Sequence, residues 1–470
     1  MRIADSASAA SLALMHSSPS IVWLRDDLRV ADNPALTAAV DRGEPVVVVY
    51  LLDEQSPGVR PLGGASRWWL HGSLSELADD LAELGGSLTL RRGAAAEVIP
   101  ALVAETGAGA VYWNRRYGAL REVDAALKSS LRDDGLVVQS FGASLLFEPW
   151  TITTGSGDPY RVFTPFWRAC LAAGEPRSPL PAPSSIAGLA VESDALDDWA
   201  LLPTRPDWAA GLREAWTPGA EGAHERLEHF IEHGLPLYHR RDEPGIEATS
   251  RLSPHLRFGE LSPHQVWARL RERLAPEAAA NRAKFLSEIG WREFSYSILF
   301  RQPQLATVNV RRDFDAFPWS RPQPEVLEAW QHGRTGIPIV DAGMRQLWMS
   351  GWMHNRVRMI VASLLTKNLL IDWRIGEQWF WDTLVDADEA NNAASWQWVA
   401  GSGADAAPYF RVFNPVLQAD RFDPGRAYVR RWVPEIDEPE YPAPIVDLAA
   451  SRRGALAAYE QVKAAKNNGA

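Results

Sequence analysis

DAGMRQLWMSGWMHNRVRMIVASLLTKNLLIDWRIGEQWFWDTLVDADEANNAASWQWVAGSGADAAPYFRVFNP, residues 341–415, is the stretch that decides the fold. Its seven tryptophans are Trp348, Trp352, Trp373, Trp379, Trp381, Trp396 and Trp398. Hydrophobic cores fill space with Leu, Ile and Val, which bring no side-chain N–H group that must find a partner. One pair such as Trp396 and Trp398 is most often core packing. Indoles interleaved with arginines, carboxylates and amides indicate instead the lining of a pocket that binds a planar ligand.

The segment around Trp352 predicts a helix that presents aromatic and amide groups to such a ligand. At helical spacing Trp348 and Trp352 share a face, and so do Trp352, Asn355 and Met359. The two arginines of the segment project to other sides, where phosphates or a carboxylate could meet them. The loop DADEANNAASWQW adds carboxylates and amides before a second aromatic pair. A planar, redox-active cofactor with hydrogen-bonding edges suits this lining.

Four motifs of this stretch resemble the flavin-binding region of the photolyase/cryptochrome family: GWMHNRVRM, LLIDWR, DAD…NN…WQW and DAAPYFRVFNP. The resemblance runs from about Ile21 to the C-terminus, with several long motifs in the family's order. Within the family the chain is most similar to bacterial members that repair cyclobutane pyrimidine dimers, including the plant-cryptochrome-like class III subclass. The resemblance therefore implies light-dependent repair of UV-damaged DNA by a protein that binds FAD.

Length and composition predict a soluble chain of at least two domains. The chain has 470 residues, of which 46% are hydrophobic and 23% charged. No apolar run approaches the roughly 20 residues that a membrane span needs. The single cysteine, Cys170, excludes a disulfide framework and the four-cysteine iron–sulfur cluster of one family branch, and it favours a reducing, cytoplasmic compartment. We expect a monomer without a metal site.

Charge is distributed unevenly along the chain. The net charge of −11 argues against a broad nucleic-acid-binding surface. Residues 1–220 hold 18 Lys and Arg against 27 Asp and Glu, whereas residues 221–470 hold 30 against 32. A local basic patch is therefore expected on the C-terminal part, and the N-terminal part is not expected to contact phosphates.

The first 150 residues alternate between strand-like and helix-like segments. The run VVVVYLLD (46–53) is typical of a strand buried on both faces. Strands are also predicted in SLTLRRG, AVYWN and LVVQSF, and helices over 66–84, 94–106 and 122–133. This alternation predicts a doubly wound parallel sheet. The Gly-x-Gly-x-x-Gly dinucleotide fingerprint does not follow the first strand.

Four regions are predicted along the chain. They are a disordered tail over 1–20, with Met15 as an alternative start, an α/β antenna domain over 21–148, a connector over 149–220, and a helical FAD-binding catalytic domain over 221–470. In the family the first domain holds a light-harvesting antenna. Ala306 and Thr307 replace the Cys-Lys of the best-known folate-binding relatives, and WNRRY replaces an acidic residue of deazaflavin-binding relatives. The antenna is thus undecided between methenyltetrahydrofolate, which we favour, and a deazaflavin.

The resemblance implies a set of FAD-binding residues. In the family the motif TS-x-LSP grips the pyrophosphate, although Ser and Thr could also serve there as plain helix caps. The expected cofactor-binding residues are Tyr238, Thr249, Ser250, Leu252, Ser253, Phe285, Arg292, Trp352, Arg358, Asp386, Asp388 and Asn392. Arg358 and Asp386 are expected to pair beside the flavin. The amide of Asn392 is expected to face flavin N5, where it cannot supply a proton.

The resemblance also implies a cavity for a dimer flipped out of the duplex, to which excited, fully reduced FAD (FADH−) would transfer an electron. The expected catalytic residues are Glu288, Trp291, Asn355, Met359, Asn392 and Trp398. The expected DNA-binding residues are Arg241, Trp291, Arg356 and Trp398. From spacing alone, Glu288 and Arg292 could instead form an i,i+4 ion pair.

Three indoles, Trp396, Trp373 and Trp319, match the family's chain that carries electrons from the surface to an oxidised flavin. Trp348 resembles a branch of that chain. Each of these residues alone could be core packing.

Three alternative functions stay open. A cryptochrome-type blue-light receptor shares the fold and the flavin, but Glu288, Trp291 and Trp398 are of the repair type. A (6-4) photolyase uses a histidine pair, and GWMHNRVRM holds only His354. A flavin oxidoreductase with a nicotinamide donor is disfavoured by the missing glycine fingerprint.

Overall fold

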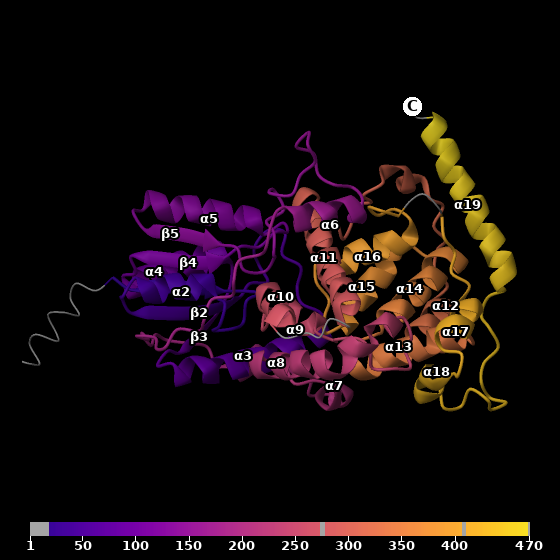
Figure 1. Cartoon of the computed structure of the whole chain (residues 1–470), viewed down its shortest axis with the longest axis horizontal. Coiled ribbons are helices and arrows are strands. Elements are labelled where there is room, and N and C mark those ends of the chain that lie inside the picture. The colour runs from indigo at the N-terminus through magenta and orange to yellow at the C-terminus, as the bar shows by residue number, and fades with distance from the viewer. Residues whose placement is uncertain (1–17, 273–277, 407–409, 469–470) are drawn as a thin grey trace, which may run out of the picture.

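The structure, a computed structural model, describes residues 18–272, 278–406 and 410–468. An α/β domain with five parallel strands leads through a connector into a domain of helices, which confirms the predicted fold class (Figure 1). The predicted tail lies outside the described residues up to residue 17, as does Met15, and the first strand begins at Ser20. None of the described helices is long and apolar enough to cross a membrane.

The sheet has the order β3-β2-β1-β4-β5, and all its strand pairs are parallel. Its strands are β1 (Ser20–Leu24), β2 (Val46–Leu52), β3 (Leu88–Arg92), β4 (Ala110–Asn114) and β5 (Val137–Phe141). Along β2, Val46 and Val48 pack into one hydrophobic cluster, and Val47 and Val49 pack into another. This strand is therefore buried on both faces, as its continuous apolar run predicts.

Helices cover both faces of the sheet. On one face, α2 (Pro34–Asp41) and α3 (Gly64–Glu83) pack into the cluster of Val46. On the other, α4 (Ala95–Thr106) and α5 (Arg121–Asp133) pack into the cluster of Val47. The predicted doubly wound arrangement is confirmed.

The helical domain is organised around five helices: α11 (Ala279–Arg301), α13 (Pro338–Ser350), α14 (Asn355–Ser363), α15 (Trp373–Thr383) and α16 (Asn391–Ala400). The remaining helices from the connector onward are α6 (Phe163–Ala172), η1 (Leu196–Trp199), α7 (Ala210–Ala215), α8 (Ala220–His229), η2 (Phe230–Gly234), η3 (Leu235–Arg240), α9 (Ser253–Phe258), α10 (Pro263–Glu272), η5 (Arg312–Ala316), α12 (Pro324–Gln331), η6 (Leu364–Asn368), α17 (Pro415–Phe422), α18 (Ala427–Trp432) and α19 (Leu448–Asn468). Indoles form part of the core, where Trp330, Trp373 and Trp396 pack among aliphatic residues.

The helix predicted through Trp348, Trp352 and Asn355 is interrupted, so the prediction that Trp352 shares a helical face with these residues and with Met359 is wrong. The first helix, α13, ends where Gly351 adopts a φ of 63°, a conformation that favours glycine. The next helix, α14, starts after a side-chain cap from the preceding histidine. Trp352 therefore lies in the link between two helices.

The two domains meet through hydrogen bonds. Arg29, from the loop after β1, donates from Nη1 to Gly259 O (2.7 Å), and Trp69 of α3 donates from Nε1 to Glu260 Oε1 (2.8 Å). Gly259 has a φ of 69°, and a Cβ there would lie 2.1 Å from Asp26 O. The close approach of the two backbones therefore requires glycine.

Candidate functional site

An ion pair and a hydroxyl group tie three segments of the helical domain together. Arg358 of α14 donates from Nη1 and Nη2 to the two carboxylate oxygens of Asp386 (3.1 and 2.8 Å). Ser253, the first residue of α9, donates to Asp386 Oδ2 (2.6 Å). The bidentate geometry fixes both charged side chains in one orientation.

The TS-x-LSP segment adjoins this ion pair. Ser250 Oγ accepts the backbone N–H of Leu252 (3.3 Å), and Arg251 takes a positive φ of 55°. The hydroxyl of Ser253 is engaged by Asp386 and does not cap the helix. Helix capping therefore does not account for Ser253, and a phosphate-binding role for this segment, including Thr249, stays a prediction.

The start of α16 holds a buried amide, and the loop before it supplies the turn. Asp388 Oδ1 accepts the backbone N–H groups of Ala390 and Asn391 (2.8 and 2.5 Å), which closes the turn that starts the helix. Asn392 is buried, and its Nδ2 donates to the backbone O and to Oε1 of Glu377 on α15 (3.0 and 2.9 Å). An amide has two N–H donors. Glu377 uses both, so only Oδ1 of Asn392 is left for another neighbour.

Buried aromatic rings supply further residues of the predicted cofactor set. Tyr238 of η3 and Phe285 of α11 meet edge to face, with ring centroids 5.4 Å apart. Trp352 is buried, and the guanidinium of Arg251 lies 4.9 Å from its ring centroid. These contacts fix the orientation of each ring.

Two residues of α11 that helical spacing could pair, Glu288 and Arg292, have different partners. Glu288 forms ion pairs with Lys284, one turn earlier (2.6 Å), and with Arg241 (3.7 Å). Arg292 instead donates from Nη1 to the backbone O of Ser144 (2.5 Å), on the segment that follows the sheet. The alternative of a Glu288–Arg292 ion pair is therefore wrong. The carboxylate of Glu288 stays half-exposed between two cations.

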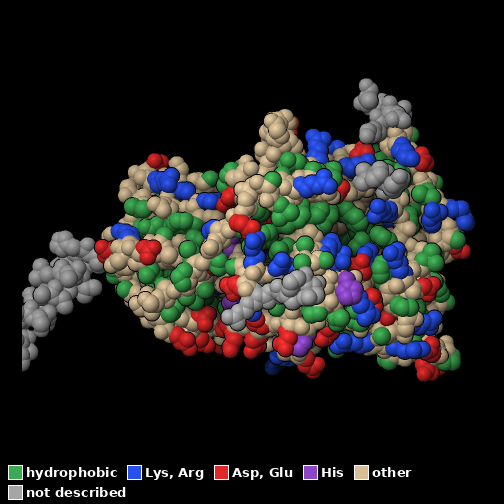
Figure 2. Space-filling model, viewed as in Figure 1, with side chains coloured by type: hydrophobic (Ala, Val, Ile, Leu, Met, Phe, Trp, Pro, Cys, Tyr) green, Lys and Arg blue, Asp and Glu red, His purple; other side chains and the backbone are tan. Residues whose placement is uncertain are grey.

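An aromatic pair joins α11 to α6. Trp291 stacks on Phe163 of α6, with ring centroids 3.9 Å apart and an interplanar angle of 11°. Trp291 itself is half-buried. Figure 2 shows a hollowed hydrophobic area over the helical domain with Lys and Arg side chains along its border, whereas acidic side chains gather over α3 and α8. This distribution agrees with the charge asymmetry of the sequence.

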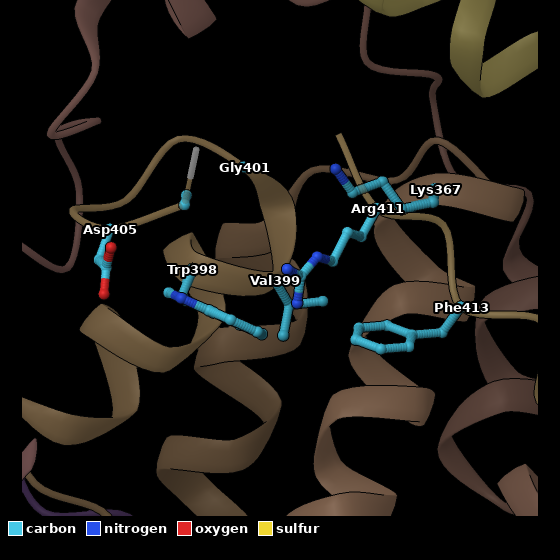
Figure 3. Close-up of a pocket in the computed structure, with 8 residues that line it drawn as sticks. Lys367, Trp398, Val399, Gly401, Asp405, Arg411 and Phe413 are labelled. Carbon is cyan, nitrogen blue, oxygen red and sulfur yellow. The ribbon is translucent and has the colours of Figure 1, made fainter. Parts of the chain in front are cut away.

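Trp398, half-buried at the end of α16, lines a small pocket (Figure 3). In this view the Arg411 side chain extends toward Val399, between Trp398 on one side and Phe413 on the other. Lys367 also lines the pocket; its ammonium group donates to Ala400 O (2.7 Å). Trp398 is therefore a half-buried aromatic ring with the Arg411 guanidinium beside it.

The first turns of α14 bring together Asn355, Arg356 and Met359. Asn355 is exposed, and Met359 is half-buried beside the Arg356 guanidinium. Arg356 forms an ion pair with Asp242 (3.0 Å), which directly follows Arg241 in the chain. The predicted DNA-binding arginines and Glu288 thus lie in one neighbourhood.

Three of the predicted electron-transfer residues belong to one core region. Trp373 and Trp396 are fully buried in the same hydrophobic cluster, and Trp319 packs against it. Trp373 Nε1 donates to Asn309 Oδ1 (2.9 Å). Trp396 Nε1 has no partner within the described chain.

Trp348, the predicted branch, lies at the surface. It is 52% exposed and stacks on Trp379 of α15, with ring centroids 6.0 Å apart and an interplanar angle of 6°. Trp379, for which the sequence suggested no role, therefore connects Trp348 of α13 to α15.

Buried donors without partners test whether the region fits a cofactor. Among the described residues, Trp396 Nε1, His354 Nε2, Arg251 Nε and Arg356 Nε are buried without a hydrogen-bond partner. Burial lowers the pKa of His354 to about 4, and its Nδ1 accepts the N–H of Arg356, so Nε2 carries the proton of a neutral ring. Buried donors need acceptors. A dinucleotide such as FAD is rich in acceptors, so these residues fit it.

Three contact residues were not singled out from the sequence. Lys284 lies one helical turn before Glu288, so the i,i+4 rule would have indicated that pair. Glu377 contacts Asn392 from the preceding helix, and Phe163 contacts Trp291 from a distant segment, so no helical spacing reveals either contact.

The carboxyl ends of β1 and β4, where the strand order reverses, are the usual ligand site of an α/β sheet. Here Arg25 occupies this position: its guanidinium lies 4.5 Å from the Trp23 ring centroid and donates to Asn114 O. Arg25 and Arg116 both form ion pairs with Asp124. The end of the sheet is thus packed with the domain's own charged side chains.

Family models match most of the chain. Residues 20–184 match the model described as "DNA photolyase", and residues 285–440 match "FAD binding domain of DNA photolyase". These ranges correspond to the sheet with its following segment and to the main part of the helical domain.

Individual relatives agree with these matches. A deoxyribodipyrimidine photo-lyase of Agrobacterium fabrum is 51% identical over 96% of this chain and 99% of its own length. Cryptochrome-1 of Arabidopsis thaliana is 39% identical over 89% of this chain and 63% of its own length. The crystal structure of a bacterial class III photolyase from Agrobacterium tumefaciens superposes with a TM-score of 0.91 at 49% identity, covering 98% of this chain and 100% of that one.

Proposed function

The chain belongs to the DNA photolyase and cryptochrome family, and from that premise we propose that it is a deoxyribodipyrimidine photo-lyase, a carbon–carbon lyase that repairs cyclobutane pyrimidine dimers in DNA. The observation that carries the proposal is the placement of Glu288 between Lys284 and Arg241, one turn from the half-buried Trp291. A carboxylate and an aromatic face at a cationic surface suit the binding of bases that have left the duplex. A helix face that only contacts solvent would not need this combination.

FAD is the proposed cofactor of the helical domain. Arg358, Asp386, Asp388, Asn392 and Trp352 would hold its ring system, together with Tyr238, Phe285 and Arg292, and the segment Thr249–Ser253 its pyrophosphate. Reduced FAD, when bound, supplies the electron that light transfers to the dimer. Arg358 and Asp386 already form an ion pair in the protein, so cofactor binding need not leave either charge unpaired.

DNA would bind at the hollowed face of the helical domain. Arg241 and Arg356 would approach phosphates, and Trp291 and Trp398 would offer aromatic faces to the two joined bases. The lesion must leave the base stack to reach these rings, and its damaged stacking lowers the cost of flipping. Asn355 and Met359 would line the same space from the first turns of α14.

Glu288 is proposed to hydrogen-bond the edge of the flipped dimer and to offset charge that develops on it. Its two cationic neighbours orient the carboxylate without removing it from the surface. The buried indoles Trp396 and Trp373, with Trp319, would carry electrons to an oxidised flavin, and Trp348 would form a branch.

An antenna chromophore is proposed for the α/β domain, with methenyltetrahydrofolate favoured over a deazaflavin. The packing of Arg25 and Arg116 at the carboxyl end of the sheet supports a position away from the usual α/β ligand site. A cytoplasmic monomer is the proposed state of the protein.

The decisive experiment uses the purified, chemically reduced protein and an oligonucleotide that carries one thymine dimer. Near-UV or blue light should restore the absorbance of intact thymines, and darkness should not. Glu288→Ala should lower the yield per absorbed photon and leave FAD bound. If light restores no thymines although FAD is bound and reduced, the repair proposal fails and the blue-light receptor becomes the better account.

A further inference from the structure

The link between β2 and α3 packs against the end of α15, far away in the sequence. Trp381 Nε1 donates to Pro61 O (2.9 Å), and the backbone N–H of Gly64 donates to Asp382 Oδ1 (2.8 Å). A Cβ on Gly63 would lie 2.2 Å from Trp381 O, so glycine permits this approach. The link is therefore fixed on the helical domain at several points.

One side chain of this link, Arg60, reaches a buried carboxylate of α15. Arg60 donates from Nη1 and Nη2 to the two carboxylate oxygens of Glu377 (2.7 and 2.9 Å). Its guanidinium also lies 4.0 Å from the ring centroid of Trp381. Glu377 is buried, and within the described chain no other cation forms an ion pair with it. A bidentate guanidinium fixes the plane of a carboxylate, which a single point charge does not.

The same carboxylate holds the buried amide of α16. Oε1 of Glu377 accepts from Arg60 and from Asn392 Nδ2 (2.9 Å), and the backbone O of Glu377 accepts from the same Nδ2 (3.0 Å). Two acceptors therefore face one end of the Asn392 amide, so this end must be the amino group. The carbonyl Oδ1 is left to point at whatever lies beyond.

We infer that Arg60, a residue of the α/β domain, is a positioning residue for the flavin site: by fixing Glu377 it sets Asn392 so that an acceptor oxygen faces the cofactor. The inference rests on the proposed function only in that FAD lies beside Asn392. An acceptor stabilises an N–H partner, and flavin N5 carries a hydrogen when the ring is reduced but is a bare acceptor when it is oxidised. The ion pair between the domains therefore favours the flavin forms that keep the N5 proton.

The test compares Arg60→Gln with Arg67→Gln, a matched control on α3 whose guanidinium pairs with the partly exposed Glu54. Each variant with bound FAD is photoreduced by one electron with an external thiol. The absorption spectrum is recorded across pH, and the midpoint potential is measured by redox titration. We expect Arg60→Gln to lower the potential and the pH at which the red absorbance of N5-protonated flavin is lost. Arg67→Gln should match the wild type in both.

Two further variants separate orientation from folding. Glu377→Gln should shift the spectrum in the same direction, and Arg60→Gln in the Glu377→Gln background should add no further shift. Arg60→Lys keeps the charge but not the two-point contact, so it should give an intermediate shift at unchanged thermal stability. A wild-type spectrum and potential in Arg60→Gln would overturn the inference, as would full additivity with Glu377→Gln.

Failure of this inference is distinguishable from failure of the proposed function, because the spectra need no DNA. FAD-loaded protein that repairs nothing but shows the shift would overturn the repair proposal alone. Arg60→Gln protein that repairs dimers and keeps the wild-type spectrum and potential would overturn the inference alone.

Discussion

Trp291 and Trp398 lie half-buried at the surface of the helical domain, whereas Trp373 and Trp396 are buried inside it. We call the first pair the wall and the second pair the buried chain. Trp396 and Trp398 are two residues apart on one helix, yet they belong to different sets. The two indoles thus differ in exposure although they belong to one motif, and we expect the wall to contact bases and the buried chain to pass electrons. Variants in one set should spare the function of the other.

The largest expected effect concerns the buried chain. Trp396→Phe keeps an aromatic ring of similar shape but removes an easily oxidised indole. Photoreduction of oxidised FAD by an external donor should therefore fall close to background. Flash photolysis followed by absorption of the flavin measures it. Trp208→Phe, at a 40% exposed indole of the connector, serves as the control and should photoreduce at the wild-type rate. Unchanged photoreduction in Trp396→Phe would remove this residue from the electron path.

The wall should show the next largest effect. Trp291→Ala removes a ring face that would stack on the flipped dimer, a contact worth about 1–3 kcal/mol per base. Affinity for a duplex with one thymine dimer should fall by roughly 5- to 150-fold, whereas affinity for undamaged duplex should change little. Fluorescence anisotropy measures both affinities. Equal losses on both duplexes would instead indicate a general loss of structure or of phosphate contacts.

A titrating carboxyl group on α11, the helix that carries Trp291, should have a smaller effect, which appears in the stability of the fold. Glu293 is fully buried on α11, and desolvation raises its pKa from about 4.5 to about 7, although Arg292 and the backbone N–H of Phe147 oppose the shift. A carboxyl with a raised folded-state pKa contributes stability that is complete below pH 4.5 and is lost as pH rises to 7, with a slope of at most about 1.4 kcal/mol per pH unit.

Glu293→Gln should therefore gain stability relative to the wild type between pH 4.5 and 7 and keep a constant difference above pH 7. Denaturant unfolding at several pH values measures this difference. Burial lowers the pKa values of His264 and His354 to about 4, so their contribution to stability is lost as pH falls from 6.5 toward 4. Both histidines are present in the wild type and in the variant, so their contribution cancels in the difference. A difference that does not vary with pH would show that Glu293 does not titrate in this range.

The smallest effect should come from the arginines beside the wall. Arg241→Ala would remove one proposed phosphate contact, so the slope of log affinity against log salt should become shallower by about 0.9. Arg213→Ala, whose partner is the exposed Asp207 of the connector, should leave the slope unchanged. A wild-type slope in Arg241→Ala would take that residue out of the DNA footprint.

The sheet shows how much could be predicted from the sequence. The β-branched run at 46–52 and the alternation of strands and helices indicate a parallel sheet because apolar periodicity and length report burial on both faces. The break at Gly351 was missed because the tryptophan spacing fits a helix and glycine does not always end one. Local patterns state what a segment can form, and the ends of segments depend on backbone conformation.

The site could be predicted only through its motifs. The pairing of Arg358 with Asp386 joins two motif residues of the same stretch. By contrast, the stacking of Phe163 on Trp291 and the contact of Arg60 with Glu377 join distant segments. Gly376 is a similar case, because a Cβ there would lie 2.2 Å from the Trp396 ring. Such contacts follow from the packing of the whole chain, and no spacing reveals them.

The most direct test of the division between wall and buried chain is the repair yield of the Trp396→Phe protein after chemical reduction. With reduction supplied from outside, the buried chain is bypassed and the wall is intact. The account predicts a yield of restored thymines per absorbed photon equal to that of the wild type. A large loss of yield in reduced, FAD-loaded Trp396→Phe protein would contradict it, because the two sets of indoles would then not act separately.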